Sequence, residues 1–257
     1  MAEQTSRRGR ATITAGNPNA ARTVLLFHGY TGSPGEFGDL PEILAKTTDS
    51  YVCIPLLPGH GTTEEDLLPY SFDNFIRAAE DSAMMLGERG GSFAIGGHSF
   101  GSYLAAHVAS LHAPSALFLA ATPYRLRFKL SFPGARYVAR AKKFWNKNID
   151  ENERQARKHQ FFYEKMPGIG LGMTMDGNVR ITESLKNIAA PLLTLQSLND
   201  PLAHADSGSW LAGYSKSTVR ENLILNEGLH GLFYGNVRHA SIAAITYFLQ
   251  RHFLEAK

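Results

Sequence analysis

The sequence predicts an α/β fold, with a mostly parallel central sheet and helices on both of its faces. Short apolar or β-branched runs alternate with amphipathic stretches along most of the 257 residues, which is the pattern of successive strand–helix–strand units. The apolar runs are almost continuous, as expected for strands buried on both faces. With 44% hydrophobic and 19% charged residues, the chain is predicted to form one large domain over residues 1–257.

Six runs are predicted to form the strands of this sheet. They are TVLLFHG (23–29), YVCIPLL (51–57), SFAIGG (92–97), SALFLAA (115–121), PLLTLQS (191–197) and ENLILNE (221–227). The segment before them, residues 1–20, contains paired arginines. In a signal sequence an apolar stretch follows the basic residues, and this segment has none, so we interpret it as a frayed polar tail.

Helices are indicated by their first residues and by their apolar faces. Ser33, Pro34 and Glu36 have the spacing of a capping box, in which the Glu36 side chain returns to the N-cap residue. Two other helices are predicted from apolar residues that recur on one face, which are Ala79, Ala83 and Leu86 in the first and Ile242, Ile245, Phe248, Leu249 and Phe253 in the second.

Residues 123–188 interrupt the alternation and are predicted to be an insertion over one edge of the sheet. Residues 123–165 hold twelve Lys or Arg against four Asp or Glu, although the net charge of the whole chain is only +3. A solvated face explains such a basic segment most simply, and attraction to an anionic lipid surface or to acidic substrate groups is the main alternative. No nucleic-acid-binding module is recognisable, so nucleic acid is not expected as a partner.

Ser99 is the candidate nucleophile of the chain. It stands in GHSFG (97–101), where the predicted strand SFAIGG passes into the predicted helix FGSYLAAHVASLH, and this context gives a G-x-S-x-G pattern its meaning. Gly97 and Gly101 remove side chains that would clash in a sharp turn. On the pentapeptide alone, an ordinary N-cap serine is an equally good interpretation.

The partners that a serine nucleophile needs follow two later strands. Asp200 comes after PLLTLQSLN and His230 comes after ENLILNEGL, and the carboxyl ends of parallel strands are where reactive groups gather. A histidine base oriented by an acid is the arrangement that activates serine. Asp206 is the second candidate for the acid, since strand ends predicted from sequence err by a few residues.

An oxyanion hole is predicted from the segment that follows the first strand. His28 and Gly29 lead into a tight turn, so the backbone N–H of Tyr30 can face the same edge of the sheet as that of Phe100. Two such amides would stabilise the oxyanion of a tetrahedral intermediate. The rings of His28, His60 and His98 are interpreted as loop-bracing groups.

These residues resemble the α/β-hydrolase superfamily, and most closely its small carboxylesterase and monoacylglycerol lipase branch. The resemblance rests on LLFHGYTGSPGEFGDLPEILA, PLLPGHG, GGHSFGSYLAA, LQSLNDP and GLHGL, which together span residues ~23–122 and ~190–256. The order Ser99, Asp200, His230 is also the order of that superfamily. The resemblance implies a serine esterase or lipase with Ser99, Asp200 and His230 as catalytic triad, acting on a small-molecule ester with an apolar acyl group.

The resemblance also bears on the insertion and on neighbouring chemistries. It implies that residues 123–188 form a cap over the site, with Phe161, Phe162, Met166, Met173 and Met175 either lining an acyl pocket or packing the cap's own core. A serine at position 99 excludes the dehalogenases and epoxide hydrolases of this fold, which use aspartate there. Thioesterase, lysophospholipase and carbon–carbon bond hydrolase activities use the same machinery, and a non-catalytic binding protein of the same fold is the alternative from another class.

No cofactor or metal is expected. The ten histidines include no H-E-x-x-H pattern, and the single cysteine, Cys53, lies in an apolar run and is interpreted as a buried core residue. No apolar run is long enough to span a bilayer. These observations favour a cytoplasmic protein, and they give no indication of its oligomeric state.

Overall fold

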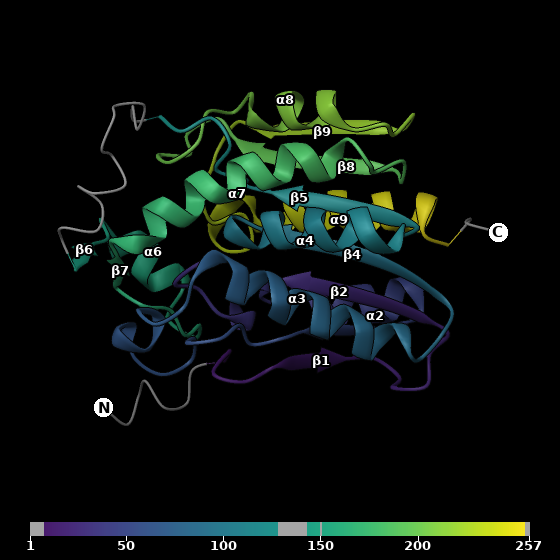
Figure 1. Ribbon diagram of the computed structural model, residues 1–257, viewed down its shortest axis with the longest axis horizontal. Coiled ribbons are helices and arrows are strands. Elements are labelled where there is room, and N and C mark those ends of the chain that lie inside the picture. The colour runs from purple at the N-terminus through teal and green to yellow at the C-terminus, as the bar shows by residue number, and fades with distance from the viewer. Residues whose placement is uncertain (1–7, 128–142, 150, 255–257) are drawn as a thin grey trace.

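The computed structural model describes residues 8–127, 143–149 and 151–254 and contains a seven-stranded, mostly parallel sheet (Figure 1). The strand order is β1-β3-β2-β4-β5-β8-β9, and every neighbouring pair is parallel except β1 with β3. The strands are β1 (Ile13–Ala15), β2 (Arg22–Phe27), β3 (Ser50–Ile54), β4 (Ser92–His98), β5 (Ala116–Ala120), β8 (Leu192–Ser197) and β9 (Arg220–Leu225).

The six predicted strands are confirmed, with ends that differ by at most three residues, but the prediction of a frayed tail is wrong for residues 8–20. Within that segment, β1 pairs antiparallel with β3, and Thr14 lies opposite Cys53. Arg8 is also fixed, because its amide donates to the carbonyl of His159 and its own carbonyl accepts from the amide of Phe161. A three-residue edge strand is too short to show periodicity, so only its pairing identifies it.

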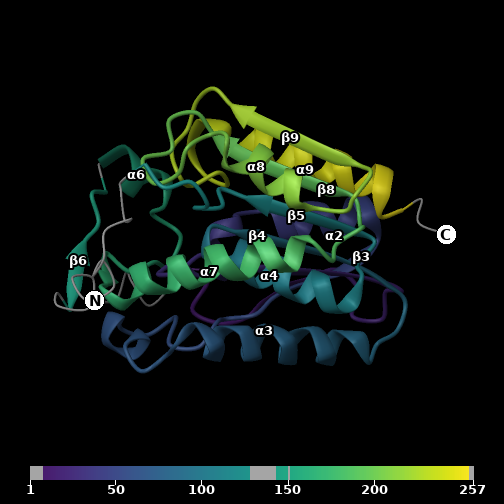
Figure 2. The ribbon, with the colours of Figure 1, turned by 45° about the horizontal axis from the view of Figure 1, so that its top comes forward.

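Helices cover both faces of the sheet. The described helices are α2 (Leu40–Thr48), α3 (Phe72–Gly87), α4 (Phe100–His112), α6 (Glu151–Ala156), α7 (Ile169–Leu185), α8 (Ser207–Tyr214) and α9 (Arg238–His252), with short 3-10 turns η1 (Pro34–Phe37), η2 (Glu64–Leu67) and η3 (Gly235–Val237). The helices α3, α4, α7 and α8 pack on one face, and α2 and α9 pack on the other. Figure 2 shows α3, α4 and α7 on one side of the sheet and α9 on the other.

The two predicted apolar helix faces are buried. Ile242, Ile245, Phe248, Leu249 and Phe253 belong to the core between α9 and the sheet. Ala79 and Ala83 of α3 belong to the core on the opposite face, and Leu86 packs against that core while partly exposed. Burial of an apolar stripe on each side therefore fixes both helix layers against the sheet.

Part of the predicted insertion is a regular helix of the layer that covers one face of the sheet. Residues 169–185 form the 17-residue helix α7, which packs against α4 and lies in the connection between the parallel strands β5 and β8. The expectation that alternation stops until residue 188 is therefore wrong, because α7 is rich in Gly and Met and its helical pattern is weak in the sequence. The irregular part ends near residue 168.

The rest of the insertion lies beyond one end of the sheet. It includes the two-stranded antiparallel pair β6 (Phe144–Asn146) and β7 (Lys165–Pro167), with α6 between them in sequence, and Figure 1 shows these elements together at the left of the molecule. Lys129, Arg136, Arg140 and Lys142 of the basic segment lie outside the described residues. In the described part of the chain, no helix is long and apolar enough to cross a membrane.

Cys53 differs from its predicted environment. It lies on β3 but is only partly buried, because Val52 and Ile54 turn to the core while Cys53 points to the opposite face of the strand. Burial nevertheless raises the pKa of the Cys53 thiol to about 11. The thiol is therefore a poor nucleophile at neutral pH.

Candidate active site

Ser99 occupies a strained turn between β4 and α4. Its φ is +53° and its ψ is −119°, values that a residue with a side chain rarely adopts. Gly97 and Gly101 make the turn possible, as predicted from the sequence: a Cβ on Gly97 would lie 2.2 Å from the carbonyl oxygen of Gly101, and one on Gly101 would lie 1.9 Å from that of Phe27. The turn leaves Ser99 partly exposed at the start of a helix.

Ser99, His230 and Asp200 form one continuous hydrogen-bonded chain. Nε2 of His230 lies 2.7 Å from Oγ of Ser99, and Nδ1 of the same ring lies 2.8 Å from Oδ2 of Asp200. An ionised carboxylate only accepts hydrogen bonds, so Nδ1 carries the proton and Nε2 presents its lone pair to the serine hydroxyl. The ring is thus held in the tautomer that can accept the hydroxyl proton.

The surroundings of Asp200 hold it as a buried anion. Its side chain is fully buried, and its Oδ1 accepts hydrogen bonds from the amides of Leu202 (2.8 Å) and Ala203 (3.2 Å). Burial alone would raise the pKa of Asp200, but the charge of His230, its hydrogen bond and the two amides bring that pKa below its usual value. Conversely, burial would lower the pKa of His230, and the charge and hydrogen bond of Asp200 raise it above its usual value.

Asp206, the second candidate for the acid, lies elsewhere. Its carboxylate forms an ion pair with Arg125 at the surface, and its side chain is 45% exposed. It stands at the N-cap of α8, six residues beyond the aspartate that reaches His230. The structure therefore brings Asp200 and not Asp206 to the histidine.

The 28–32 loop lies directly against Ser99. A Cβ on Gly29 would come within 3.3 Å of the Cβ of Ser99. The amide of Gly29 donates to Glu36 and that of Thr31 donates to Nε2 of His60. Between them, the amide of Tyr30 has no acceptor among the described residues, and neither has that of Phe100, the first residue of α4.

His28 and His60 brace this loop, as the sequence predicts. His28 accepts from the amide of Leu57 at Nε2 (3.1 Å) and donates from Nδ1 to the carbonyl of Gly29 (3.0 Å). His60 accepts from Thr31 in the same way and donates from Nδ1 to Pro58 (2.9 Å). Burial lowers the pKa of both rings, that of His60 to about 3, so both are neutral.

Glu36 is a member of the site that the sequence assigns wrongly. The structure contains no capping box at η1: Ser33 makes no cap hydrogen bond, and its hydroxyl instead donates to the carbonyl of Phe161 at 2.6 Å. The Glu36 side chain turns inward and accepts from the amide of Gly29 (2.6 Å) and from Nδ1 of His98 (2.8 Å). Its spacing from Ser33 satisfies a local motif, and only the tertiary structure shows the competing partners.

The segment 144–168 is attached to the 28–32 loop. Nζ of Lys147 donates to Oγ1 of Thr31 at 2.9 Å, and the amide of Tyr163 donates to the carbonyl of Thr31 at the same distance. The hydroxyl of Tyr163 donates to the carbonyl of Gly59 at 2.9 Å. These bonds place part of the insertion over the carboxyl ends of β2 and β3.

The same segment contacts the loop that carries His230. The hydroxyl of Tyr234 donates to Glu153 at 3.0 Å, and Arg157 donates to the same carboxylate at 3.1 Å. The guanidinium of Arg157 also stacks on Phe162, 3.8 Å from the ring centroid. The insertion therefore touches both the 28–32 loop and the loop that carries His230.

The apolar residues singled out in the insertion are mostly buried. Phe161 and Met173 belong to the core that also contains Phe100 beside the serine, and Phe162 is covered by Arg157. Met166 and Met175 are partly exposed. Core packing therefore accounts for Phe161 and Met173, and an acyl-lining role for the group stays a prediction.

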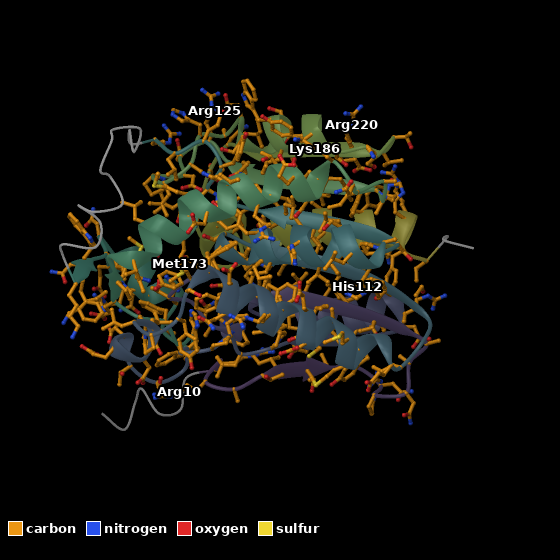
Figure 3. All side chains as sticks on the ribbon, in the orientation of Figure 1. Arg10, His112, Arg125, Met173, Lys186 and Arg220 are labelled. Carbon is orange, nitrogen blue, oxygen red and sulfur yellow. The ribbon has the colours of Figure 1, made fainter. Side chains whose placement is uncertain are left out.

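Basic side chains lie at more than one edge of the molecule. Figure 3 shows Arg10 at the lower edge of the molecule and Arg125, Lys186 and Arg220 towards the upper edge. Arg154 is paired with Glu164, and Arg157 is buried.

Within the described ranges, no group of three His, Cys, Asp or Glu side chains is arranged to hold a metal ion.

Comparison with known proteins shows the family. The model of the alpha/beta hydrolase family matches residues 24–228, which include Ser99 and Asp200. The chain therefore belongs to the alpha/beta hydrolase family.

Three known proteins illustrate the similarity. The thermostable monoacylglycerol lipase of Bacillus sp. (strain H-257) is 36% identical over 89 residues, which is 35% of this chain and 35% of that enzyme, so the match spans about a third of the relative's length. A solved structure from work on LipS and LipT, two metagenome-derived lipolytic enzymes, matches with a TM-score of 0.83 and 19% identity over 96% of this chain and 99% of that one. The monoacylglycerol lipase of Paleococcus ferrophilus matches with a TM-score of 0.75 and 18% identity over 94% and 98% of the two chains.

Proposed function

We propose that this protein hydrolyses carboxylic esters through an acyl-enzyme on Ser99. The observation that carries the proposal is the unbroken chain from Asp200 through His230 to Ser99, with donor–acceptor distances of 2.8 and 2.7 Å. This arrangement supplies a nucleophile, a general base and a group that orients the base.

The proposed reaction has two halves. Nε2 of His230 takes the hydroxyl proton as Oγ of Ser99 attacks the ester carbonyl, and the tetrahedral intermediate then expels the alcohol, which receives that proton from His230. In the second half, His230 takes a proton from water, the hydroxide attacks the acyl-enzyme, and the acid leaves as Oγ regains its proton from His230. Asp200 stabilises the imidazolium that forms in each half.

The amides of Tyr30 and Phe100 are proposed to bind the oxyanion. Both belong to segments that adjoin Ser99, and neither donates to an acceptor within the described part of the chain. The amides on either side of Tyr30 are already engaged, by Glu36 and by His60. Tyr30 is therefore the residue of this turn whose donor is left for a substrate.

The preference for an ester rests on the relatives. The proteins that the chain resembles are named as monoacylglycerol lipases and lipolytic enzymes, so a small ester with an apolar acyl group is the proposed substrate. Thioesters, lysophospholipids and carbon–carbon bonds can be cleaved by the same groups and are the alternative substrates. Attachment of the substrate through an anionic lipid surface stays a prediction, as does the cytoplasmic location.

The experiment that tests the proposal compares Ser99→Ala with Ser110→Ala. Ser110 lies on the same helix α4, and its hydroxyl donates to the carbonyl of His107, so it is a matched control. Ser99→Ala is expected to lower the turnover of a short p-nitrophenyl ester by several orders of magnitude and to abolish labelling by a fluorophosphonate, whereas Ser110→Ala retains both. Absence of labelling in the wild-type protein would instead favour a non-catalytic binding protein.

A further inference from the structure

A buried pair of side chains, Glu36 and His98, lies behind the proposed triad. Glu36 is 4% exposed and His98 is 5% exposed, and Oε1 of Glu36 lies 2.8 Å from Nδ1 of His98. The proposed reaction uses neither side chain. A buried charge is stable only when hydrogen bonds or an opposite charge compensate for its lost hydration. The groups that bond to Glu36 and His98 therefore indicate which parts of the site the pair connects.

The pair touches three loops that come from different strands. Glu36 accepts from the amide of Gly29 at 2.6 Å, in the loop after β2. His98 is the residue before Ser99, at the end of β4. Its Nε2 lies 3.1 Å from the carbonyl oxygen of His230, in the loop after β9. Glu36 and His98 therefore connect the 28–32 loop, the nucleophile turn and the loop of the histidine base.

The hydrogen-bond partners define the protonation of the pair. Burial would raise the pKa of Glu36, but the charge of His98, its hydrogen bond, the charge of His28 and the amide of Gly29 lower that pKa to about 2, so Glu36 is a carboxylate. A carboxylate oxygen and a carbonyl oxygen are both acceptors. Each ring nitrogen of His98 faces one of them, so both contacts are hydrogen bonds only if the ring carries a hydrogen on each nitrogen.

The neighbouring histidines provide an internal contrast. At Nε2, His28 faces the amide of Leu57 and His60 faces the amide of Thr31. An amide N–H requires a lone pair on the ring nitrogen, so these two rings carry one hydrogen each. All three rings are buried, and the difference between them lies in the partners alone.

We propose that Glu36 and His98 are positioning residues that form a carboxylate–imidazolium pair and hold the three loops of the active site in register. The proposal rests on the proposed function for its kinetic consequence, although the charge state of His98 does not depend on it. The rings of Phe37 and Phe233 flank His98, with centroids at 6.5 and 5.5 Å, and help to keep water from the pair. The ring of His230 lies on a further side, at 5.5 Å.

The first test measures ring protonation directly. In protein labelled with ¹⁵N-histidine, long-range ¹H–¹⁵N spectra at pH 7.5 should contain a ring with hydrogens on both nitrogens, and His98→Asn should remove that signal. Glu36→Gln removes the negative charge that stabilises an imidazolium, so the same ring should carry one hydrogen only. A His98 ring with a single hydrogen in the wild-type protein would overturn the charged pair.

The second test separates positioning from binding. Glu36→Gln retains the shape of the side chain and an acceptor for Gly29, so the fold should persist and the KM for a short p-nitrophenyl ester should stay within about twofold. We expect kcat to fall roughly 10- to 100-fold, because displacement of reacting groups by about 1 Å has an effect of that size. A kcat within twofold of the wild type would contradict the positioning role.

A matched control is available in the pair Glu80–His107. It is also a carboxylate–histidine contact, at 2.7 Å, but it joins α3 to α4 away from Ser99. Glu80→Gln should leave kcat unchanged. If Glu36→Gln does not fold, the wild-type ring spectrum and His98→Asn still decide the charge state, and a wild-type protein without esterase activity would defeat the proposed function while leaving the spectral result intact.

Discussion

Nδ1 of His230 lies 2.8 Å from Oδ2 of Asp200, although thirty residues separate the two in the chain. The strands that precede them, β8 and β9, are neighbours and run parallel. Their carboxyl ends therefore open at the same edge of the sheet, and each loop needs only a few residues to bring its side chain to the other.

The acid of the site can be identified by comparing Asp200→Asn with Asp206→Asn. Asp200→Asn is expected to lower kcat by about 10³- to 10⁴-fold, because an amide in that place favours the wrong tautomer of the histidine. Asp206→Asn removes only an ion pair with Arg125, and that side chain is 45% exposed, so its kcat should match the wild type. Steady-state kinetics with one ester suffices, and equal losses in the two variants would count against Asp200 as the acid.

The pH dependence of the reaction should reflect His230. The reaction needs the neutral ring, and Asp200 raises the pKa of His230 above its usual value of 6.5. Activity is therefore lost as the pH falls through that raised pKa, and the acid limb of kcat/KM, which reports the free enzyme, should have its midpoint above 6.5. Rates measured between pH 5 and 9 check this, and a midpoint at or below 6.5 disagrees with the described geometry.

The positive φ at position 99 should lower the free energy of unfolding of the protein. Ser99 has a φ of +53°, where glycine alone is free of steric strain. Ser99→Gly and Ser99→Ala both remove the nucleophile, so neither should turn over the ester, and they differ only in the Cβ. We expect Ser99→Gly to be more stable than Ser99→Ala by about 1 kcal/mol in urea unfolding. Equal stabilities would mean that the turn is unstrained.

Glycine substitutions in two helices should have opposite results. Gly101→Ala would place a Cβ 1.9 Å from the carbonyl oxygen of Phe27, and we expect it to lower the free energy of unfolding by about 3 kcal/mol or more. Gly172 of α7 has nothing within 4 Å of the corresponding position, so Gly172→Ala should be neutral or stabilising by up to about 1 kcal/mol. Thermal unfolding of the two variants beside the wild type distinguishes these outcomes.

Lys147 should make stability depend on pH. Burial, followed by the charge of Arg157, lowers the pKa of Lys147 to about 7 from an ordinary value of 10.5. Between those values the unfolded chain binds more protons than the folded one, so the contribution of Lys147 to stability increases as the pH rises from about 7 towards 10. Urea unfolding of the wild type and Lys147→Met at pH 6.5, 8 and 9.5 should show this difference changing in favour of the wild type, and a constant difference would contradict it.

Much of the fold and of the candidate site follows from local patterns. The six long strands were predicted from apolar runs, and Ser99 from a serine between two glycines at a strand–helix junction. These patterns are legible because each depends on residues within a few positions of one another. The strand β1 and the helix α7 were missed, since one is too short and the other too rich in glycine to show a clear period.

The charged residues of the site were less predictable. Glu36 has the spacing of a helix cap, yet its carboxylate bonds to Gly29 and His98, and the latter is 62 positions away. Asp200 and Asp206 both follow β8, and the sequence predicts Asp200 as the acid with Asp206 as the second candidate. Their partners follow other strands, so no local pattern distinguishes the carboxylate that is buried beside His230 from the one that forms a surface ion pair.

By itself, the sequence determined the alternation of strands and helices. It also determined which reactive side chains follow β2, β4, β8 and β9. Both could be predicted because hydrophobic periodicity and turn chemistry are local properties of a chain. Only the tertiary structure decided that Asp200 reaches His230, that Glu36 turns inward to His98, and that part of the basic insertion bonds to the 28–32 loop. Those choices depend on which strand ends are adjacent in the sheet, and adjacency across tens of residues is set by packing of the whole domain.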